Sequence, residues 1–242
     1  MNVKFGDILK LGEHTLLCGD STEQAMVQEV IAGPPVLTIT DPPYGVSLGC
    51  NDKRNSRLAE IKIRNDRRMM WTKAFANFPA PTLYCWAASS SELAMSAIQD
   101  ANYKIRQPIV WVKDHFTLHR SLYHWRHEIC YVATKLGEKS PWYGDRKQTT
   151  VWEEKKPRGK ERIHPSQKPL GVYLRPIHNH TREGEVVADP FAGSGNIFIA
   201  CEQTGRKAVG VEISEQCCSD MIERYHRETG NEVSLMRNIF DE

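Results

Sequence analysis

The chain has 242 residues, of which 40% are hydrophobic and 26% are charged, and its formal net charge is only +2. This length suits one domain, or one domain with an insertion, and is ample for a hydrophobic core. No early run of signal-peptide kind occurs, and no stretch approaches the roughly 20 apolar residues of a membrane span, so the sequence argues against a membrane protein and predicts a cytoplasmic one.

Short apolar runs separated by turn residues predict alternating strands and helices along the first half of the chain. The expected elements are a strand at 14–20, a helix to about residue 30, a strand at 35–40, a helix at 71–78, a strand at 82–86, a helix at 91–101, and strands at 105–112 and 128–133. The stretch 45–70 shows neither period, and we interpret it as a mobile loop long enough to have a function of its own.

The strand at 35–40 ends in Asp41-Pro42-Pro43-Tyr44, a sequence that constrains its own geometry. Two consecutive prolines cannot continue a strand ladder, and each restricts the residue before it. Asp41 and the Pro42 carbonyl therefore form a stiff pair of acceptors at the carboxyl end of a strand, where open α/β sheets bind ligands. With the Tyr44 ring beside it, such a pair suits an exocyclic amino group on a nucleobase. The simpler alternative is a sharp turn and nothing more.

The middle of the chain carries most of the basic charge. Residues 101–182 contain 17 Lys and Arg against seven Asp and Glu, whereas 183–242 contain five against 12. Within this basic region, 113–163 combines aromatic, histidine and basic residues. We interpret it as a candidate recognition insert for nucleic acid, and a solvated charged face is the alternative.

Metal sites and disulfides are not expected. The pairs His115/His119 and His124/His127 have metal-like spacing, but no carboxylate or thiolate pattern supports them, so we predict no metal. The seven cysteines contain no Cys-x-x-Cys pair, which favours reduced, packed thiols.

The last 60 residues predict a β-α-β-α unit. Its parts are a strand at 185–189, a tight turn at Gly193-Ser194-Gly195, a helix at 196–204, a strand at 207–213 and a helix at 215–229. Glu212, 17 positions after Gly195, stands where mononucleotide-binding units hold ribose hydroxyls. Phe198 replaces the third glycine of a dinucleotide fingerprint, which argues against a nicotinamide cofactor.

Three motifs along the chain carry a family resemblance. They are Asp41-Pro42-Pro43-Tyr44, His164-Pro165-Ser166-Gln167-Lys168-Pro169 and Asp189-Pro190-Phe191-Ala192-Gly193-Ser194-Gly195. In this order they resemble the amino-group DNA methyltransferases, the N4-cytosine/N6-adenine DNA methylases, in the permuted order called β. The resemblance covers nearly the whole chain. It implies an α/β fold with a doubly wound, mainly parallel, circularly permuted seven-stranded sheet, as a single methyltransferase domain over 1–242 in which 113–163 is a small basic DNA-recognition insert.

The resemblance also implies the residues of the site. Asp41, Pro42, Pro43 and Tyr44 would be catalytic. The cofactor would be S-adenosylmethionine, and the residues implied to bind it are Asp20 near its adenine, Glu212 on its ribose, Asp189 near its amino group, Gln167 and Lys168 at its methionine end, and Phe191, Gly193, Ser194 and Gly195 along it.

The implied reaction is methyl transfer to the N6 amino group of an adenine that is flipped out of duplex DNA, by direct in-line attack. The Asp at the first motif position favours adenine, and none of the seven cysteines follows a proline, as the nucleophile of carbon-5 cytosine methylases does. The alternatives are N4 of cytosine, an RNA substrate, or an inactive relative that only binds nucleic acid. The small insert favours a short or loosely read target. A homodimer and a cognate restriction endonuclease are both left open as partners.

Overall fold

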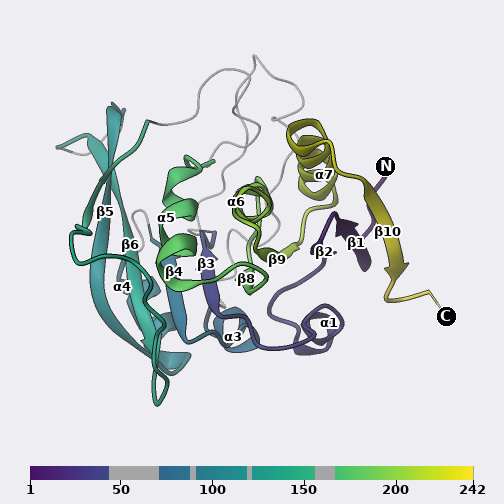
Figure 1. Ribbon diagram of the computed structural model, residues 1–242, viewed down its shortest axis with the longest axis horizontal. Coiled ribbons are helices and arrows are strands. Elements are labelled where there is room, and N and C mark those ends of the chain that lie inside the picture. The colour runs from purple at the N-terminus through teal and green to yellow at the C-terminus, as the bar shows by residue number, and fades with distance from the viewer. Residues whose placement is uncertain (44–70, 88–90, 119–121, 156–166, 242) are drawn as a thin grey trace.

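The computed structural model describes residues 1–43, 71–87, 91–118, 122–155 and 167–241. Within these ranges the strands form one ten-stranded sheet, in the order β10-β1-β2-β9-β8-β3-β4-β6-β5-β7 (Figure 1). No helix of the described ranges combines the length and the apolar character that crossing a bilayer requires.

The bounds of the elements are as follows. The strands are β1 (Asp7–Leu11), β2 (His14–Cys18), β3 (Leu37–Thr40), β4 (Thr82–Trp86), β5 (Tyr103–Thr117), β6 (Trp125–Lys135), β7 (Val151–Glu153), β8 (Val186–Asp189), β9 (Lys207–Glu212) and β10 (Val233–Asn238). The helices are α1 (Gln24–Gln28), α3 (Trp71–Asn77), α4 (Ser91–Asp100), α5 (Gly171–His180), α6 (Asn196–Thr204) and α7 (Glu215–Thr229).

The centre of the sheet is parallel. The adjacent strands β2, β9, β8, β3 and β4 run in one direction, and β6 lies antiparallel between β4 and β5. The run from β2 to β5 therefore contains the seven strands that the sequence predicts, and the mainly parallel α/β fold is confirmed. Beyond this prediction, β10 and β1 extend one edge and β7 extends the other.

Helices cover both faces of the sheet, and β4 shows why. Successive side chains of a strand point to opposite faces. Leu83 and Cys85 pack in the core cluster that contains residues of α3 and α4, whereas Tyr84 and Trp86 pack in the cluster that contains α5, α6 and α7. A strand that is apolar at every position is thus buried from both sides, as expected for a doubly wound sheet.

Glycines stop two of the helices where the sequence predicts. α6 ends at Gly205 (φ 68°) and α7 at Gly230 (φ 74°), both in the left-handed region that glycine adopts without a steric penalty. At its other end α7 begins at Ser214, whose side chain accepts a hydrogen bond from the Cys217 N–H at 3.3 Å.

Part of the predicted recognition insert lies in strands of the sheet. β5 and β6 form a long antiparallel hairpin that runs through the predicted boundary at residue 113, so part of 113–163 belongs to the sheet itself. The sequence also gave no indication of α5, which has a proline inside it, Pro176. The predicted loop at 45–70 lies outside the described residues.

The two ends of the chain meet at one edge of the sheet. β1 pairs antiparallel with β10, with Asp7 opposite Asn238, and both termini lie on this side in Figure 1. Ends that lie close together are what a circularly permuted chain requires, because the cut must fall where the old connection ran.

We expect Phe198→Ala to lower the free energy of unfolding by about 3–5 kcal/mol, because the ring is fully buried and its removal leaves a cavity against Gly210. Urea unfolding followed by circular dichroism measures the change. The control is Leu136→Ala, at an exposed position, which should cost no more than about 0.5 kcal/mol. Equal losses in both variants would contradict the assigned packing.

Candidate active site at the carboxyl edge of the sheet

The parallel strands bring most of the predicted site residues to one edge. Cys18 pairs with Glu212 and Thr40 with Cys85, so β2, β9, β3 and β4 end at nearly the same level. Asp20 and Asp41 follow two of these strands, and the neighbouring β8 ends in Asp189. Asp20 and Glu212 are 192 positions apart in the sequence, and strand order brings them to the same edge of the sheet.

Asp189 is the most deeply buried of these carboxylates, with 1% of the residue exposed. It accepts hydrogen bonds from the Thr40 hydroxyl at 2.8 Å and from the Phe191 N–H at 3.1 Å. Burial raises the pKa of Asp189 to about 7, against the two hydrogen bonds, which lower it. The negative charges of Asp41 and Glu212 raise the pKa further. Asp189 therefore ties β8 to the end of β3, directly before the Asp-Pro-Pro segment.

The glycine turn after β8 is open on one side and packed on the other. Gly193 and Gly195 have φ of 50° and 76°. A Cβ on Gly195 would lie 2.3 Å from Cγ of Met221, whereas a Cβ on Gly193 would have only the Phe191 carbonyl oxygen nearby, at 3.7 Å. Bare backbone at Gly193 thus borders open space, as a cradle for a bound cofactor requires.

Glu212 holds this turn in place. Its carboxylate accepts the N–H of Gly193 at 3.0 Å and the N–H of Ser214 at 2.9 Å, and burial raises its pKa. A carboxylate has about four lone-pair sites, so these two bonds leave acceptor capacity for ribose hydroxyls. The free acceptor sites of Glu212 therefore fit S-adenosylmethionine, the cofactor that the sequence predicts.

Ser194 belongs to the same turn, and Asp20 follows β2 at the same edge of the sheet. The Asp20 carboxylate accepts both the N–H of Thr22 at 2.9 Å and its hydroxyl at 2.8 Å, which fixes the chain as it leaves β2. The Ser194 carbonyl accepts a hydrogen bond from Arg224 at 2.9 Å. Both predicted residues are buried, and each is held by its neighbours.

The predicted catalytic carboxylate forms a buried ion pair. Lys168, whose side chain is 2% exposed, contacts Asp41 Oδ2 and also lies 3.1 Å from Glu128 Oε2. Its carbonyl accepts a hydrogen bond from the Asn196 amide at 2.7 Å, which ties this segment to the start of α6. The ammonium lies 5.4 Å from the centre of the Trp86 ring. Lys168, which the sequence assigns to the cofactor, thus contacts Asp41, the predicted catalytic carboxylate.

Sequence reasoning missed Glu128 and Lys113, which continue this ion pair along the hairpin. Lys113 Nζ lies 2.7 Å from Glu128 Oε1. Burial by itself would raise the pKa of Glu128, but the ammonium groups of Lys168 and Lys113 outweigh it and lower the pKa to about 2. A charged residue inside a strand pattern was the available signal. No local motif shows which partner it meets.

The other predicted residues differ in how much the structure says of them. Gln167 is buried next to Lys168, and Pro42 and Pro43 follow β3 as expected. Tyr44, the last of the predicted catalytic residues, lies outside the described residues. In the described ranges no group of three or more His, Cys, Asp or Glu residues could hold a metal ion.

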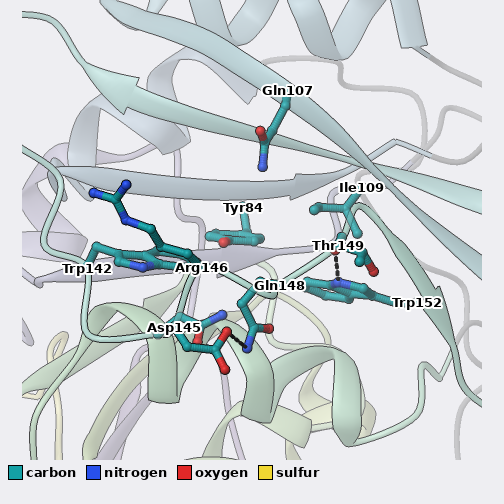
Figure 2. A pocket seen from close by; sticks show the side chains of 10 residues that line it. Tyr84, Gln107, Ile109, Trp142, Asp145, Arg146, Gln148, Thr149 and Trp152 are labelled. Atoms are coloured by element: carbon teal, nitrogen blue, oxygen red, sulfur yellow. Dashed lines mark hydrogen bonds between the residues drawn. The ribbon is translucent and has the colours of Figure 1, made fainter.

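A separate cavity of about 300 Å³ lies on the α5 side of the hairpin (Figure 2). Three aromatic side chains, Tyr84, Trp142 and Trp152, line it together with polar residues, and the Trp152 indole N–H donates to the Thr149 carbonyl at 3.0 Å. None of the predicted site residues is among those that line it, so this cavity is distinct from the candidate active site.

Known proteins resemble this chain in sequence and in fold. The N6/N4 DNA methylase family model matches residues 36–224. The type II methyltransferase M2.DpnII of Streptococcus pneumoniae is 25% identical over 227 residues, covering 82% of this chain and 84% of that protein. The M1.HpyAVI–SAM complex has a TM-score of 0.65 at 22% identity, covering 86% of this chain and 97% of that one. The cytosine-N4-specific PvuII DNA methyltransferase has a TM-score of 0.62 at 15% identity, covering 93% and 97%.

Asp189→Asn should flatten the pH dependence of stability. Because burial raises the pKa of Asp189 from 3.8 to about 7, the folded protein keeps a proton that the unfolded chain releases. The stabilisation that this retained proton provides is complete below about pH 4 and is lost as the pH rises through about 7. Between pH 5 and 8 the free energy of unfolding of the wild type should therefore fall by about 1–3 kcal/mol more than that of the variant.

Urea titrations at several pH values measure this difference. The exposed Asp100 provides the control, because Asp100→Asn should leave the wild-type pH dependence in place. Parallel curves for Asp189→Asn and the wild type would contradict the assigned pKa.

Proposed function

Because the chain belongs to the N6/N4 DNA methylase family, we propose that it transfers a methyl group from S-adenosylmethionine to the N6 amino group of adenine in DNA. The observation that carries this proposal is the position of Asp41. It follows a central parallel strand, pairs with the buried Lys168, and lies at the same edge of the sheet as the Gly193–Gly195 turn.

Asp41 and the Pro42 carbonyl act as acceptors for the two amino hydrogens of the target base. The lone pair of an exocyclic amino nitrogen is delocalised into the ring, which makes it a poor nucleophile. Two acceptors that each take one N–H favour a pyramidal nitrogen with its lone pair directed outward. This stabilises the reacting state more than the ground state, and that difference lowers the barrier. Tyr44 stacks on the base.

The cofactor side of the site holds and orients the methyl donor. Glu212 would take the ribose hydroxyls, Asp20 would lie near the adenine, and the turn at Gly193–Gly195 with Phe191 would line the remainder. When bound, S-adenosylmethionine supplies an activated sulfonium methyl group, so orientation of the two reactants provides much of the rate. No covalent bond between protein and substrate is required.

The end of the β5/β6 hairpin is the element best suited to contact DNA. We define it as residues 114–118 and 122–127, which continue past the buried Lys113 and Glu128. Its exposed side chains include Phe116, Tyr123 and Trp125, and Arg126 adds a positive charge. Aromatic side chains can stack on unpaired bases or insert between stacked base pairs. A base that flips out of the duplex leaves a gap in the stack that such a side chain can fill.

A short or loosely read target follows from the small size of this region. The hairpin end, the rest of 113–163 and the 45–70 segment are the parts of the chain proposed to read bases. Most contacts of a basic surface go to phosphates, which position the duplex without reading sequence.

The first test is product analysis. The wild type, incubated with labelled S-adenosylmethionine and unmethylated random-sequence DNA, should yield 6-methyladenine nucleoside after digestion, within target sites shorter than six base pairs. Asp41→Ala should bind the cofactor as the wild type does and lose at least about 100-fold in turnover, because a principal acceptor is gone. N4-methylcytosine as the product would overturn the choice of base, and full turnover by Asp41→Ala would overturn the mechanism.

The second test concerns the hairpin end. Tyr123→Ala should raise the Kd for a short labelled duplex about tenfold, since stacking on one base contributes roughly 1–3 kcal/mol. Fluorescence anisotropy at low and moderate salt measures this, and wild-type affinity should fall steeply with salt. Met236→Ala, at an exposed position on β10 at the far edge of the sheet, is the control and should bind as the wild type does.

A further inference from the structure

Four charged side chains, two buried and two half-buried, form a row from the proposed catalytic carboxylate to the β5/β6 hairpin. Asp41 contacts Lys168, Lys168 lies 3.1 Å from Glu128 Oε2, and Lys113 lies 2.7 Å from Glu128 Oε1. The exposed fractions of the four side chains range from 2% to 16%. We call these four residues the charge chain. Its signs alternate, so the set is neutral as a whole.

The register of the sheet explains how the charge chain forms. Trp86 on β4 pairs with Cys130 on β6, and Glu128 comes two residues before Cys130, so both point to the same face. Glu128 pairs in turn with Trp111 on β5, and Lys113 follows two residues later on that face. The adjacent strands β6 and β5 thus carry Glu128 and Lys113, whereas Asp41 follows β3 and Lys168 precedes α5.

Two tryptophans lie beside the ammonium groups. Lys168 Nζ lies 5.4 Å from the centre of the Trp86 ring, and Lys113 Nζ lies 5.5 Å from the centre of the Trp111 ring. The two rings meet edge to face at 6.2 Å. Because the indole faces attract cations and exclude water, each ammonium is held between a carboxylate and an apolar wall.

We propose that Glu128 is a positioning residue for methyl transfer, acting on Asp41 through the ammonium of Lys168. The inference rests on the proposed role of Asp41 as acceptor for the target amino group. Without Glu128, the positive charges of both Lys168 and Lys113 would act on the single carboxylate of Asp41 and weaken it as an acceptor. Glu128 offsets the second ammonium, so that Asp41 is oriented by Lys168 and keeps more of its negative charge.

Lys113 completes the arrangement by balancing Glu128. Without Lys113, one ammonium would serve two buried carboxylates, and without Glu128, two ammonium groups would share one carboxylate. An uncompensated buried charge is strongly unfavourable. Loss of Lys113 or of Glu128 therefore changes how the remaining members of the charge chain interact with one another. The balance of charge, rather than the shape of any one side chain, is what the proposal makes important.

The decisive variant is Glu128→Gln, which keeps the size and a hydrogen-bond acceptor but removes the charge. We expect kcat to fall about tenfold, while the KM for DNA and the Kd for S-adenosylmethionine stay within about twofold of the wild type. Single-turnover assays and isothermal titration calorimetry measure these quantities. The matched control is Glu13→Gln, which breaks the 3.2 Å ion pair with Lys207 at the opposite end of the parallel strands and should retain full kcat.

The double variant Glu128→Gln/Lys113→Met separates an electrostatic role from a structural one. It restores neutrality with Asp41 and Lys168 alone, so kcat should return to within about threefold of the wild type. A double variant as slow as Glu128→Gln or slower, with wild-type circular dichroism, would overturn the proposal, as would full kcat in Glu128→Gln itself. A wild type that methylates no base would instead refute the proposed function, so the two failures are distinguishable.

Discussion

The buried ammonium of Lys168 is the point at which the parts of this protein are held together. The ammonium contacts Asp41 after β3 and Glu128 on β6. The backbone carbonyl of Lys168 accepts a hydrogen bond from the Asn196 side chain at the start of α6. A buried charge is tolerated only with close partners, so these three segments cannot separate without a large penalty. The same requirement holds Asp41, the proposed catalytic carboxylate, against the sheet although it lies beyond the end of its strand.

The site concentrates acidic groups where the fold tolerates them poorly. Asp189 is enclosed at the end of a central strand, and its pKa of about 7 records the unfavourable burial of its charge. Hydrogen bonds from Thr40 and Phe191 recover part of that loss. A carboxylate that weakens the fold but joins β8 to β3 is typical of a residue kept for its position in a site.

The acidic and basic parts of the sequence form different parts of the fold. The acidic C-terminal unit contributes the glycine turn and Glu212, and the basic middle contributes the β5/β6 hairpin. Within the proposed function, this division keeps negative groups near the cofactor side and positive or aromatic groups where a polyanion would lie. The charge chain crosses between the two parts.

The sequence by itself determined the elements with strong local signals. The apolar run ending in Asp41, the turn at Gly193–Gly195 and the helix stops at Gly205 and Gly230 all depend on neighbouring residues, and the described structure has each of them. The mainly parallel sheet followed from alternating strands and helices, together with the family resemblance. Weakly patterned elements such as β1, β7 and β10 were missed, because strands at or next to the sheet edges depend on pairing with residues that local patterns do not show.

Only the tertiary structure decided which charges meet. Asp41, Glu128 and Lys168 are far apart in the sequence, and their contact depends on strand order and on the face to which each side chain points. A shift of one residue in the pairing of β6 would turn Glu128 to the opposite face. Local patterns cannot encode such a choice, because it is made by the packing of the whole sheet.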